Sequence, residues 1–317
     1  MANKLIVSAA PHITSADSTS KIMGRVCIAL LPTLIASVLI FGFQALLLTA
    51  VTVAACVVFE YAYCKLVGRD VTISDLSAVV TGLLLAFNLP AGLPVWMSLV
   101  GAFIAIVIIK QLFGGLGYNF ANPAIVGRIA MALGFTGAMT SYTYPENGID
   151  ALASATPLAV EETAQNAGSY VTLLLGNHGG VLGETCAITL LIGGIYLIWT
   201  KVISPTIPVT YLATVAVFSL LCGYDPIYQL LSGGLILGAF FMATDYVTSP
   251  TTEKGKLVFG IGLGVITCLI RFFGTMNEGV SFAILLMNLL VPYIEVLTRQ
   301  DLLGFSKPKK NKGGAAK

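Results

Sequence analysis

Long apolar runs separated by short polar connections are the dominant pattern of this sequence. Between Val26 and Phe59 no residue is charged, and this stretch is too long for one crossing, since a spanning helix needs about 20 apolar residues. Gly42 and Gln44 divide it into two predicted helices. The apolar runs together predict about ten transmembrane helices, near 22–42, 44–64, 76–89, 94–113, 121–135, 180–200, 206–222, 227–243, 257–273 and 280–297.

The composition agrees with a lipid environment. Of the 317 residues, 56% are hydrophobic and 10% are charged, whereas soluble domains carry about 25% charged residues. A surface so poor in charge would aggregate in water, so the fold class predicted is an all-α integral membrane protein surrounded by a lipid bilayer. The net charge of +2 gives no reason to expect nucleic acid as a partner. The six cysteines form no C-x-x-C pair, which favours buried apolar roles over metal ligation.

The distribution of lysine and arginine predicts the orientation. Basic residues are enriched in cytoplasmic loops, and a cytoplasmic N-terminus places nearly all of them on that side, with Arg271 as the exception. The segment 136–179 holds four acidic residues and no lysine or arginine. We therefore expect a multi-pass protein of the cell membrane with both termini in the cytoplasm. The predicted organisation is a cytoplasmic segment 1–21, a five-helix unit 22–135, an extracytoplasmic loop 136–179, a second five-helix unit 180–297 and a basic cytoplasmic tail 298–317.

The two predicted units resemble each other in sequence. The run from Thr81 to Phe87 is similar to the run from Gly233 to Phe240, and Phe113-Gly114 is similar to Phe273-Gly274. Five is an odd number, so the second unit would enter the membrane from the opposite side, which predicts two inverted repeats. Inverted repeats place binding sites near the midplane at the repeat interface. Glycine-rich matches also recur by chance in apolar helices, and this alternative remains.

One threonine in the long polar connection is a candidate for chemistry. Small residues lead up to Thr156, and Pro157 follows it. A residue before proline is pushed into an extended conformation, which would project the Thr156 hydroxyl where small neighbours leave room for a bulky group. An ordinary surface turn would produce the same pattern.

Several motifs occur together along nearly the whole chain, from about residue 10 to about residue 300. They are Ala10-Pro11-His12-Ile13, Ser18-Thr19-Ser20-Lys21-Ile22-Met23, Ser74-Asp75-Leu76-Ser77, Thr81-Gly82, Asn88-Leu89-Pro90, Lys110, Gly117-Tyr118-Asn119-Phe120-Ala121-Asn122-Pro123-Ala124, Arg128 and Ala243-Thr244-Asp245-Tyr246-Val247-Thr248-Ser249-Pro250. In this combination the chain resembles the RnfD family, the D subunits of the Rnf complex, and more distantly the NqrB subunits of sodium-pumping NADH:quinone oxidoreductases.

The resemblance implies a covalent flavin. Members of the family carry flavin mononucleotide (FMN) joined through its phosphate to a threonine in a D-x-x-[ST]-[GS]-A-T motif, and a separate flavin transferase makes the bond. Asp150, Ser154, Ala155 and Thr156 match this motif, whereas Ala153 departs from it. The resemblance therefore assigns covalent FMN to Thr156, on the extracytoplasmic side. NqrB-like relatives also hold a non-covalent riboflavin, and the repeat interface around Thr81-Gly82 and Gly233-Gly234 is the expected place for its flat ring.

The resemblance also implies the function. It predicts an electron-transfer subunit of a ferredoxin:NAD oxidoreductase complex that translocates Na⁺ or H⁺, a subunit with no catalysis of its own. The sequence has no dinucleotide-binding fingerprint and no cysteine cluster for iron–sulfur centres, so both would lie in partner subunits of the complex. Two alternatives remain: an NqrB-like subunit of a Na⁺-pumping NADH:quinone oxidoreductase, and a small-solute channel or transporter built from inverted repeats.

Three further polar residues each admit two interpretations. Arg128 lies in a short apolar run, where an unpaired charge is costly, so it either contacts a flavin or pairs with an acid or the membrane interface. Asn119 and Asn122 precede the same run, and Asn122-Pro123 has the pattern of an N-cap followed by a first helical residue. Contact of either asparagine with a ligand is the second interpretation.

Overall fold

The computed structural model describes residues 17–142, 170–176, 178–184, 186–274 and 279–299. Within these ranges every regular element is a helix, and extended pairing is limited to an isolated bridge between Pro90 and Val181. Four helices are long and apolar enough to cross a membrane: α1 (Thr19–Phe41), α2 (Phe43–Val67), α13 (Glu253–Phe273) and α14 (Val280–Thr298). Their outward faces carry large apolar side chains, and Leu39 is 80% exposed. Such faces suit lipid rather than water.

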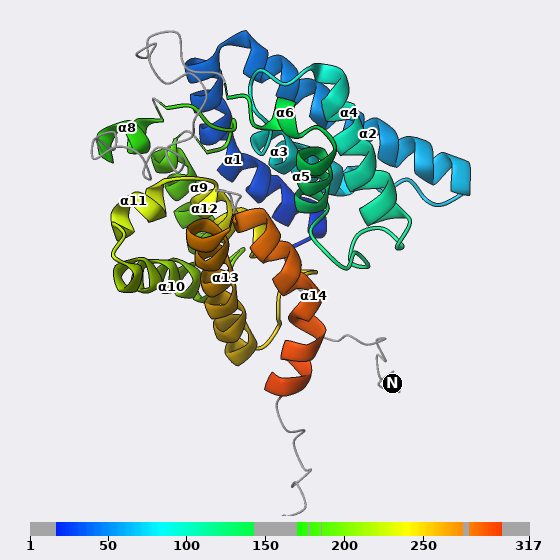
Figure 1. Ribbon diagram of the computed structural model, residues 1–317. Coiled ribbons are helices and arrows are strands. Elements are labelled where there is room, and N and C mark those ends of the chain that lie inside the picture. Colours follow the sequence, from blue (N-terminus) through cyan, green and yellow to red (C-terminus); the bar gives the residue numbers. More distant parts are fainter. Residues whose placement is uncertain (1–16, 143–169, 177, 185, 275–278, 300–317) are drawn as a thin grey trace, which may run out of the picture.

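The first half of the chain combines long helices with shorter ones (Figure 1). Gly42 alone joins α1 to α2, with a positive φ of 72° that glycine adopts without strain. The next elements are η1 (Ile73–Asp75), α3 (Ser77–Phe87), α4 (Val95–Phe103), which continues as the π-helical η2 (Ile104–Gln111), α5 (Pro123–Gly134) and α6 (Thr136–Met139). α3 is apolar on nearly every side, which is typical of a helix buried within a protein. It packs against α1, α2 and α5.

The second half contains α8 (Tyr170–Leu175), α9 (Ala187–Trp199), α10 (Thr206–Cys222), α11 (Pro226–Leu231) and α12 (Leu235–Leu237), which continues as the π-helical η4 (Gly238–Met242), followed by α13 and α14. The predicted helix at 227–243 is therefore broken at Gly233, whose φ is 70°. The run predicted at 180–200 becomes helical at Ala187. Short helices α6 and α8 lie inside the segment predicted as a loop.

The two halves of the chain are joined by backbone hydrogen bonds where helices are interrupted. The segment after α3 meets the segment before α9: the Leu182 amide donates to the Leu89 carbonyl (3.1 Å) and the Gly183 amide donates to the Phe87 carbonyl (2.7 Å). A Cβ on Gly183 would lie 2.5 Å from that of Phe87, so the approach requires glycine. Buried backbone groups outside a helix need hydrogen-bond partners inside the protein, and this contact supplies them.

Helices of the two halves also pack directly, α1 against α9 and α5 against α14. Glycine permits the first contact, because a Cβ on Gly193 of α9 would lie 2.2 Å from the Ala29 carbonyl oxygen of α1. Figure 1 shows α1 passing close to α9 while α2 and α4 lie farther out in the first half. The interior shared by the two halves therefore lies beside α1, α3 and α9.

We expect the Gly193→Ala variant to unfold at a lower temperature in detergent, because the added methyl group must push α9 away from α1. Overpacking of this kind costs about 1–3 kcal/mol. Gly134→Ala is the matched control, since a Cβ at Gly134 meets nothing within 4 Å and alanine is the better helix former by about 1 kcal/mol. Thermal unfolding of both purified variants tests this expectation, and equal midpoints would contradict it.

Candidate ligand pocket between the two halves

A pocket lies where the two halves of the chain meet. The space in it that no protein atom fills is ≈ 800 Å³, including its open mouth. Its walls combine apolar side chains with a few polar ones, as is typical of ligand-binding sites. The lining residues are Ile22, Met23, Val26, Ser77, Val80, Thr81, Leu84, Lys110, Leu116, Asn119, Asn122, Pro123, Leu197, Val202, Ile203, Phe240, Phe241, Thr244, Asp245, Tyr246 and Val247. Both halves therefore contribute to one site.

Local structure brings the two asparagines to the pocket wall. The Asn122 side-chain oxygen accepts from the amides of Ala124 (3.1 Å) and Ile125 (3.4 Å), which confirms the predicted N-cap of α5. Its amide nitrogen donates to the Met242 carbonyl at the end of η4 (3.3 Å), so Asn122 also links the two halves. The Asn119 amide donates to the Ala121 carbonyl (3.0 Å) and stabilises the turn before α5. Helix capping and pocket lining thus coincide in Asn122.

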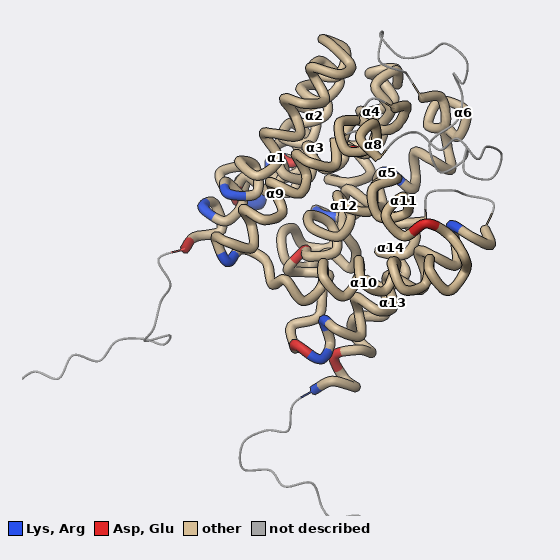
Figure 2. The backbone as a smooth tube through the Cα atoms, turned by 90° about the vertical axis from the view of Figure 1, so that its left-hand side faces the viewer, with Lys and Arg blue, Asp and Glu red and all other residues tan. Residues whose placement is uncertain are grey.

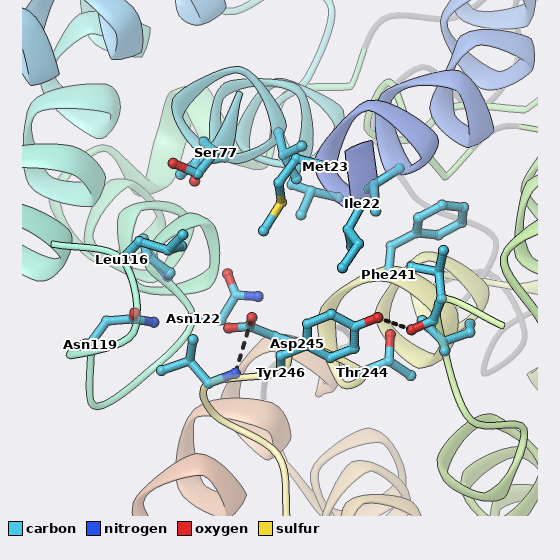
Figure 3. Close-up of a pocket in the computed structure, with 18 of the residues that line it drawn as sticks. Ile22, Met23, Ser77, Leu116, Asn119, Asn122, Phe241, Thr244, Asp245 and Tyr246 are labelled. Carbon is cyan, nitrogen blue, oxygen red and sulfur yellow. Dashed lines mark hydrogen bonds between the residues drawn. The ribbon is translucent and has the colours of Figure 1, made fainter. Parts of the chain in front are cut away.

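The opposite wall follows directly after η4. The Asp245 carboxylate accepts from the Thr248 hydroxyl (3.0 Å) and from the Val247 amide (3.5 Å), and these bonds fold the chain into a tight turn. The Tyr246 hydroxyl donates to the Val202 carbonyl, which lies in the connection between α9 and α10. Figure 3 shows Ile22 and Met23 pointing toward Asn122 and Asp245 across the pocket. Apolar side chains of α1 thus face polar groups on the far wall.

A buried charge cluster borders the pocket. Lys110, 2% exposed, donates to the Glu60 carboxylate (2.7 Å) and to the Ser77 hydroxyl (2.6 Å). Ser77 in turn donates to Asp75 through its hydroxyl (2.5 Å) and its amide (2.8 Å). The Thr72 hydroxyl donates to the other oxygen of Glu60 (2.6 Å). Four elements, α2, η1, α3 and η2, are therefore held together around one ion pair.

Some of the candidate site residues from the sequence analysis line the pocket and others do not. Thr81, Asn119 and Asn122 all line the pocket, and the Thr81 hydroxyl donates to the Ser77 carbonyl (2.9 Å). Gly82 faces α2 instead, where a Cβ would lie 2.8 Å from the Val53 Cα, so it serves close helix packing. Arg128 also lies outside the pocket lining. The predicted attachment motif, namely Asp150, Ser154, Ala155 and Thr156, falls outside the described residues.

Arg128 takes part in a second buried contact between the halves. It lies on α5, and its Nη1 donates to the Ser281 hydroxyl on α14. The buried Glu184 carboxylate, just before α9, interacts electrostatically with it, and the Val181 amide donates to this carboxylate (3.4 Å). Pairing with an acid, one of the two interpretations of Arg128, therefore has a partner in the structure.

α8 is the first described element after the segment that contains Thr156, and a side-chain contact holds its first residue in place. The Tyr170 hydroxyl donates to the Asp225 carboxylate, which also accepts from the Ile227 amide (2.9 Å) and so caps α11. These hydrogen bonds, first of all that from Tyr170, hold the pKa of the Asp225 carboxyl below its usual value. The end of the predicted loop is thus anchored to the second half.

The residue that sequence reasoning missed is Glu60. It follows directly on the charge-free run that ends at Phe59, and it lies within a predicted span. An intramembrane carboxylate is a signal for a functional site and implies a nearby partner. The partner itself, Lys110, is 50 positions away, so the sequence gives no local pattern that would pair the two.

Comparison with known proteins places the chain among relatives of similar length. The model of the NQR2, RnfD, RnfE family matches residues 6–304. The chain is 47% identical over 310 residues to the D subunit of the Na⁺-translocating ferredoxin:NAD⁺ oxidoreductase complex of Acetobacterium woodii, covering 96% of this chain and 97% of that protein. It is 41% identical to the D subunit of the proton-translocating ferredoxin:NAD⁺ oxidoreductase complex of Clostridium ljungdahlii, covering 95% and 97%. It is 35% identical to the D subunit of the ion-translocating oxidoreductase complex of Actinobacillus succinogenes, covering 96% and 99%.

Proposed function

This chain belongs to the NQR2, RnfD, RnfE family, and we propose that it is the membrane-embedded electron-transfer subunit of an ion-translocating ferredoxin:NAD⁺ oxidoreductase complex. The observation that carries the proposal is its similarity, over nearly the full length, to relatives named as D subunits of such complexes. The subunit is not catalytic alone, because the sequence lacks a dinucleotide-binding fingerprint and an iron–sulfur cysteine cluster. Other subunits of the complex supply both.

The proposal covers either coupling ion. One relative is named as Na⁺-translocating and the other as proton-translocating, although they are 47% and 41% identical to this chain over the aligned residues. An NqrB-like subunit of a Na⁺-pumping NADH:quinone oxidoreductase is the nearest alternative within the family. The names of the relatives favour the ferredoxin-linked complex. A small-solute channel is a second alternative, and it would require neither flavin nor partner subunits.

We place a covalent FMN at Thr156 in the segment 136–179. Support comes from the motif alone: Asp150, Ser154, Ala155 and Thr156 occupy the positions that the family pattern requires. A flavin transferase would form the phosphoester with the threonine hydroxyl during maturation. FMN supplies one- and two-electron transfer chemistry, and this chain supplies the acceptor hydroxyl and the position of the loop.

We place a second flavin, a non-covalent riboflavin, in the pocket between the halves. The chemistry of the pocket suits a flavin, because its walls offer apolar side chains for the flat ring and polar side chains for the polar edge of the ring. Ile22, Met23 and Phe241 would contact the faces of a ring, while Asn119 and Asn122 would hydrogen-bond its polar edge. Asp245 and Thr81 would accept hydrogen bonds from ring or side-chain donors. The chain's own contribution is to orient the ring and to exclude water from it.

The topology proposed is ten spans in two inverted five-helix repeats with both termini in the cytoplasm. Contacts of α1 with α9 and of α5 with α14 support it, because corresponding helices of two repeats meet at a pseudo-twofold axis. Figure 2 shows most lysine and arginine positions gathered toward the end of the molecule where α1 begins and α14 ends. This asymmetry supports a cytoplasmic location for that end and an extracytoplasmic location for the Thr156 segment.

Deletion and complementation test the assigned function. Membranes that lack this chain should lose ferredoxin-dependent NAD⁺ reduction and the ion uptake coupled to it, and reintroduction of the full chain should restore both. The control is passive solute flux in vesicles that contain the purified chain alone. Solute flux from the chain alone, together with unchanged NAD⁺ reduction in the deletion, would favour the channel and reject the redox subunit.

We expect the Asn122→Ser variant to bind riboflavin roughly fivefold more weakly, because it loses one amide donor worth about 1 kcal/mol. Serine caps a helix about as well as asparagine, so α5 should still form. Fluorescence quenching of riboflavin by the purified chain measures the affinity. Ser98→Ala is the control, since the Ser98 hydroxyl donates within α4 to the Val95 carbonyl and Ser98 does not line the pocket, and this change should leave the affinity unchanged. An unchanged affinity in Asn122→Ser would contradict the assigned contact.

A further inference from the structure

The two partners of the buried ion pair are placed differently with respect to the pocket. Lys110 and Ser77 line the pocket, whereas Glu60 does not. Lys110 is therefore the partner on the pocket side of the pair, and the Glu60 carboxylate lies 2.7 Å from its ammonium group. Both side chains are buried, with relative exposures of 2% and 0%. In such surroundings a charge acts more strongly than in water because screening is weak.

The position of the Lys110 ammonium is fixed from several sides. The Ser77 hydroxyl accepts one hydrogen bond from it and is itself held by Asp75. Thr72 holds the second oxygen of Glu60. The backbone around Lys110 belongs to the π-helical element η2, and the Lys110 carbonyl accepts from the Gly115 amide (2.9 Å). A charge held this firmly does not need to reorganise when a neighbouring group changes its own charge.

Stability alone is a poor explanation for this pair. Taking two ions out of water costs several kcal/mol for each ion, and well-packed apolar residues often do as well. A pair with its positive end against a cavity has a further consequence, because it favours any ligand state that carries more negative charge. Across the cavity Asp245 is the opposing charged group that lines the wall, and its carboxylate is occupied by Thr248 and Val247.

We propose that Lys110 is a positioning residue that raises the electron affinity of the redox ring bound in this pocket, and that Glu60 limits the effect. The inference rests on the proposed function, which places a flavin there. Addition of an electron makes the ring more negative, and the nearby ammonium stabilises that state. No bond forms or breaks in this step. Charge near a flavin ring is one of the means by which proteins tune its potential.

The test is a redox titration of the non-covalent flavin in the purified full chain. Thr156→Ala serves as the background, since it removes the proposed covalent flavin and leaves the pocket flavin as the optical signal. Lys110→Met should lower the midpoint potential, because the positive charge is gone. Glu60→Gln should raise it, because the same ammonium then acts without its counter-charge. Lys65→Met is the control: Lys65 is exposed at the end of α2, and its removal should leave the potential unchanged.

Midpoint potentials that shift down in Lys110→Met and up in Glu60→Gln indicate that the charges tune the flavin. A purely structural role would weaken flavin binding or folding in both variants and would not move the potential in opposite directions. If Glu60→Gln does not fold, the double variant Lys110→Met/Glu60→Gln buries no unpaired charge and should lower the potential. Retained flavin with equal potentials in all variants overturns the role of Lys110 and leaves the proposed function intact. A chain that binds no flavin, by acid extraction and chromatography, overturns both the occupant of the pocket and this inference.

Discussion

The Thr156→Ala variant should lose covalent flavin completely. A phosphoester needs a hydroxyl oxygen on the protein, and alanine offers none, so the effect is all or none rather than graded. The chain is co-expressed with a flavin transferase and separated on a denaturing gel, where covalent flavin appears as a fluorescent band. Thr156→Ser is the matched variant. It keeps a hydroxyl at the same position and should retain fluorescence, with a yield set by how well the transferase accepts serine.

Membrane insertion should be the same in both variants, because Thr156 belongs to the polar segment 136–179 and its replacement removes no apolar span. Equal amounts of chain in the membrane fraction are the control for this. Ala153 departs from the family motif, so Ala153→Ser, which restores it, should match or exceed the original yield of flavin. A band that stays fluorescent in Thr156→Ala would place the flavin on another residue, and a dark band in the unaltered chain with active transferase would refute covalent attachment.

The helical architecture could be predicted from the sequence wherever apolar runs were long and their interruptions were strong. Gly42 divides α1 from α2 as expected, and α10 spans Thr206–Cys222 as predicted. The prediction was wrong at 227–243, which is broken into α11, α12 and η4. The signal was present in Gly233-Gly234, since glycine pairs favour interruption. The continuous apolar run at 227–243 nevertheless predicts one helix, because a buried interruption is as apolar as a buried helix.

The pocket could be predicted only in part. Local capping patterns single out Asn119 and Asn122, the repeat match and the resemblance single out Thr81, and the structure brings all three to the pocket wall. Ile22, Met23 and Phe241 were not assigned to a site, because apolar residues in apolar helices give no sign of which cavity they face. Local patterns reveal caps and turns, whereas contacts between distant helices depend on packing that no short window contains.

The second large effect expected is on stability, at the ion pair of Glu60 and Lys110. Glu60→Leu removes the carboxylate that pairs directly with the buried Lys110 ammonium, and breaking a buried pair in this way costs about 3–5 kcal/mol. The Thr72 and Ser77 hydroxyls cannot replace the lost charge, because a hydroxyl is neutral. Thermal unfolding of the purified chain in detergent, with tryptophan fluorescence as the signal, measures the loss.

The double variant Glu60→Leu/Lys110→Met decides whether that loss arises from charge or from packing. If the unpaired ammonium is the cause, its removal should restore most of the stability, since well-packed apolar residues replace a buried pair at little cost. If lost packing around α2 and η2 is the cause, the second substitution should add to the first, and the double variant should be the least stable. A coupling free energy near zero between the two positions would contradict an interaction at 2.7 Å. A strong coupling would show that the pair acts as one unit, which the proposed effect on the neighbouring redox ring requires.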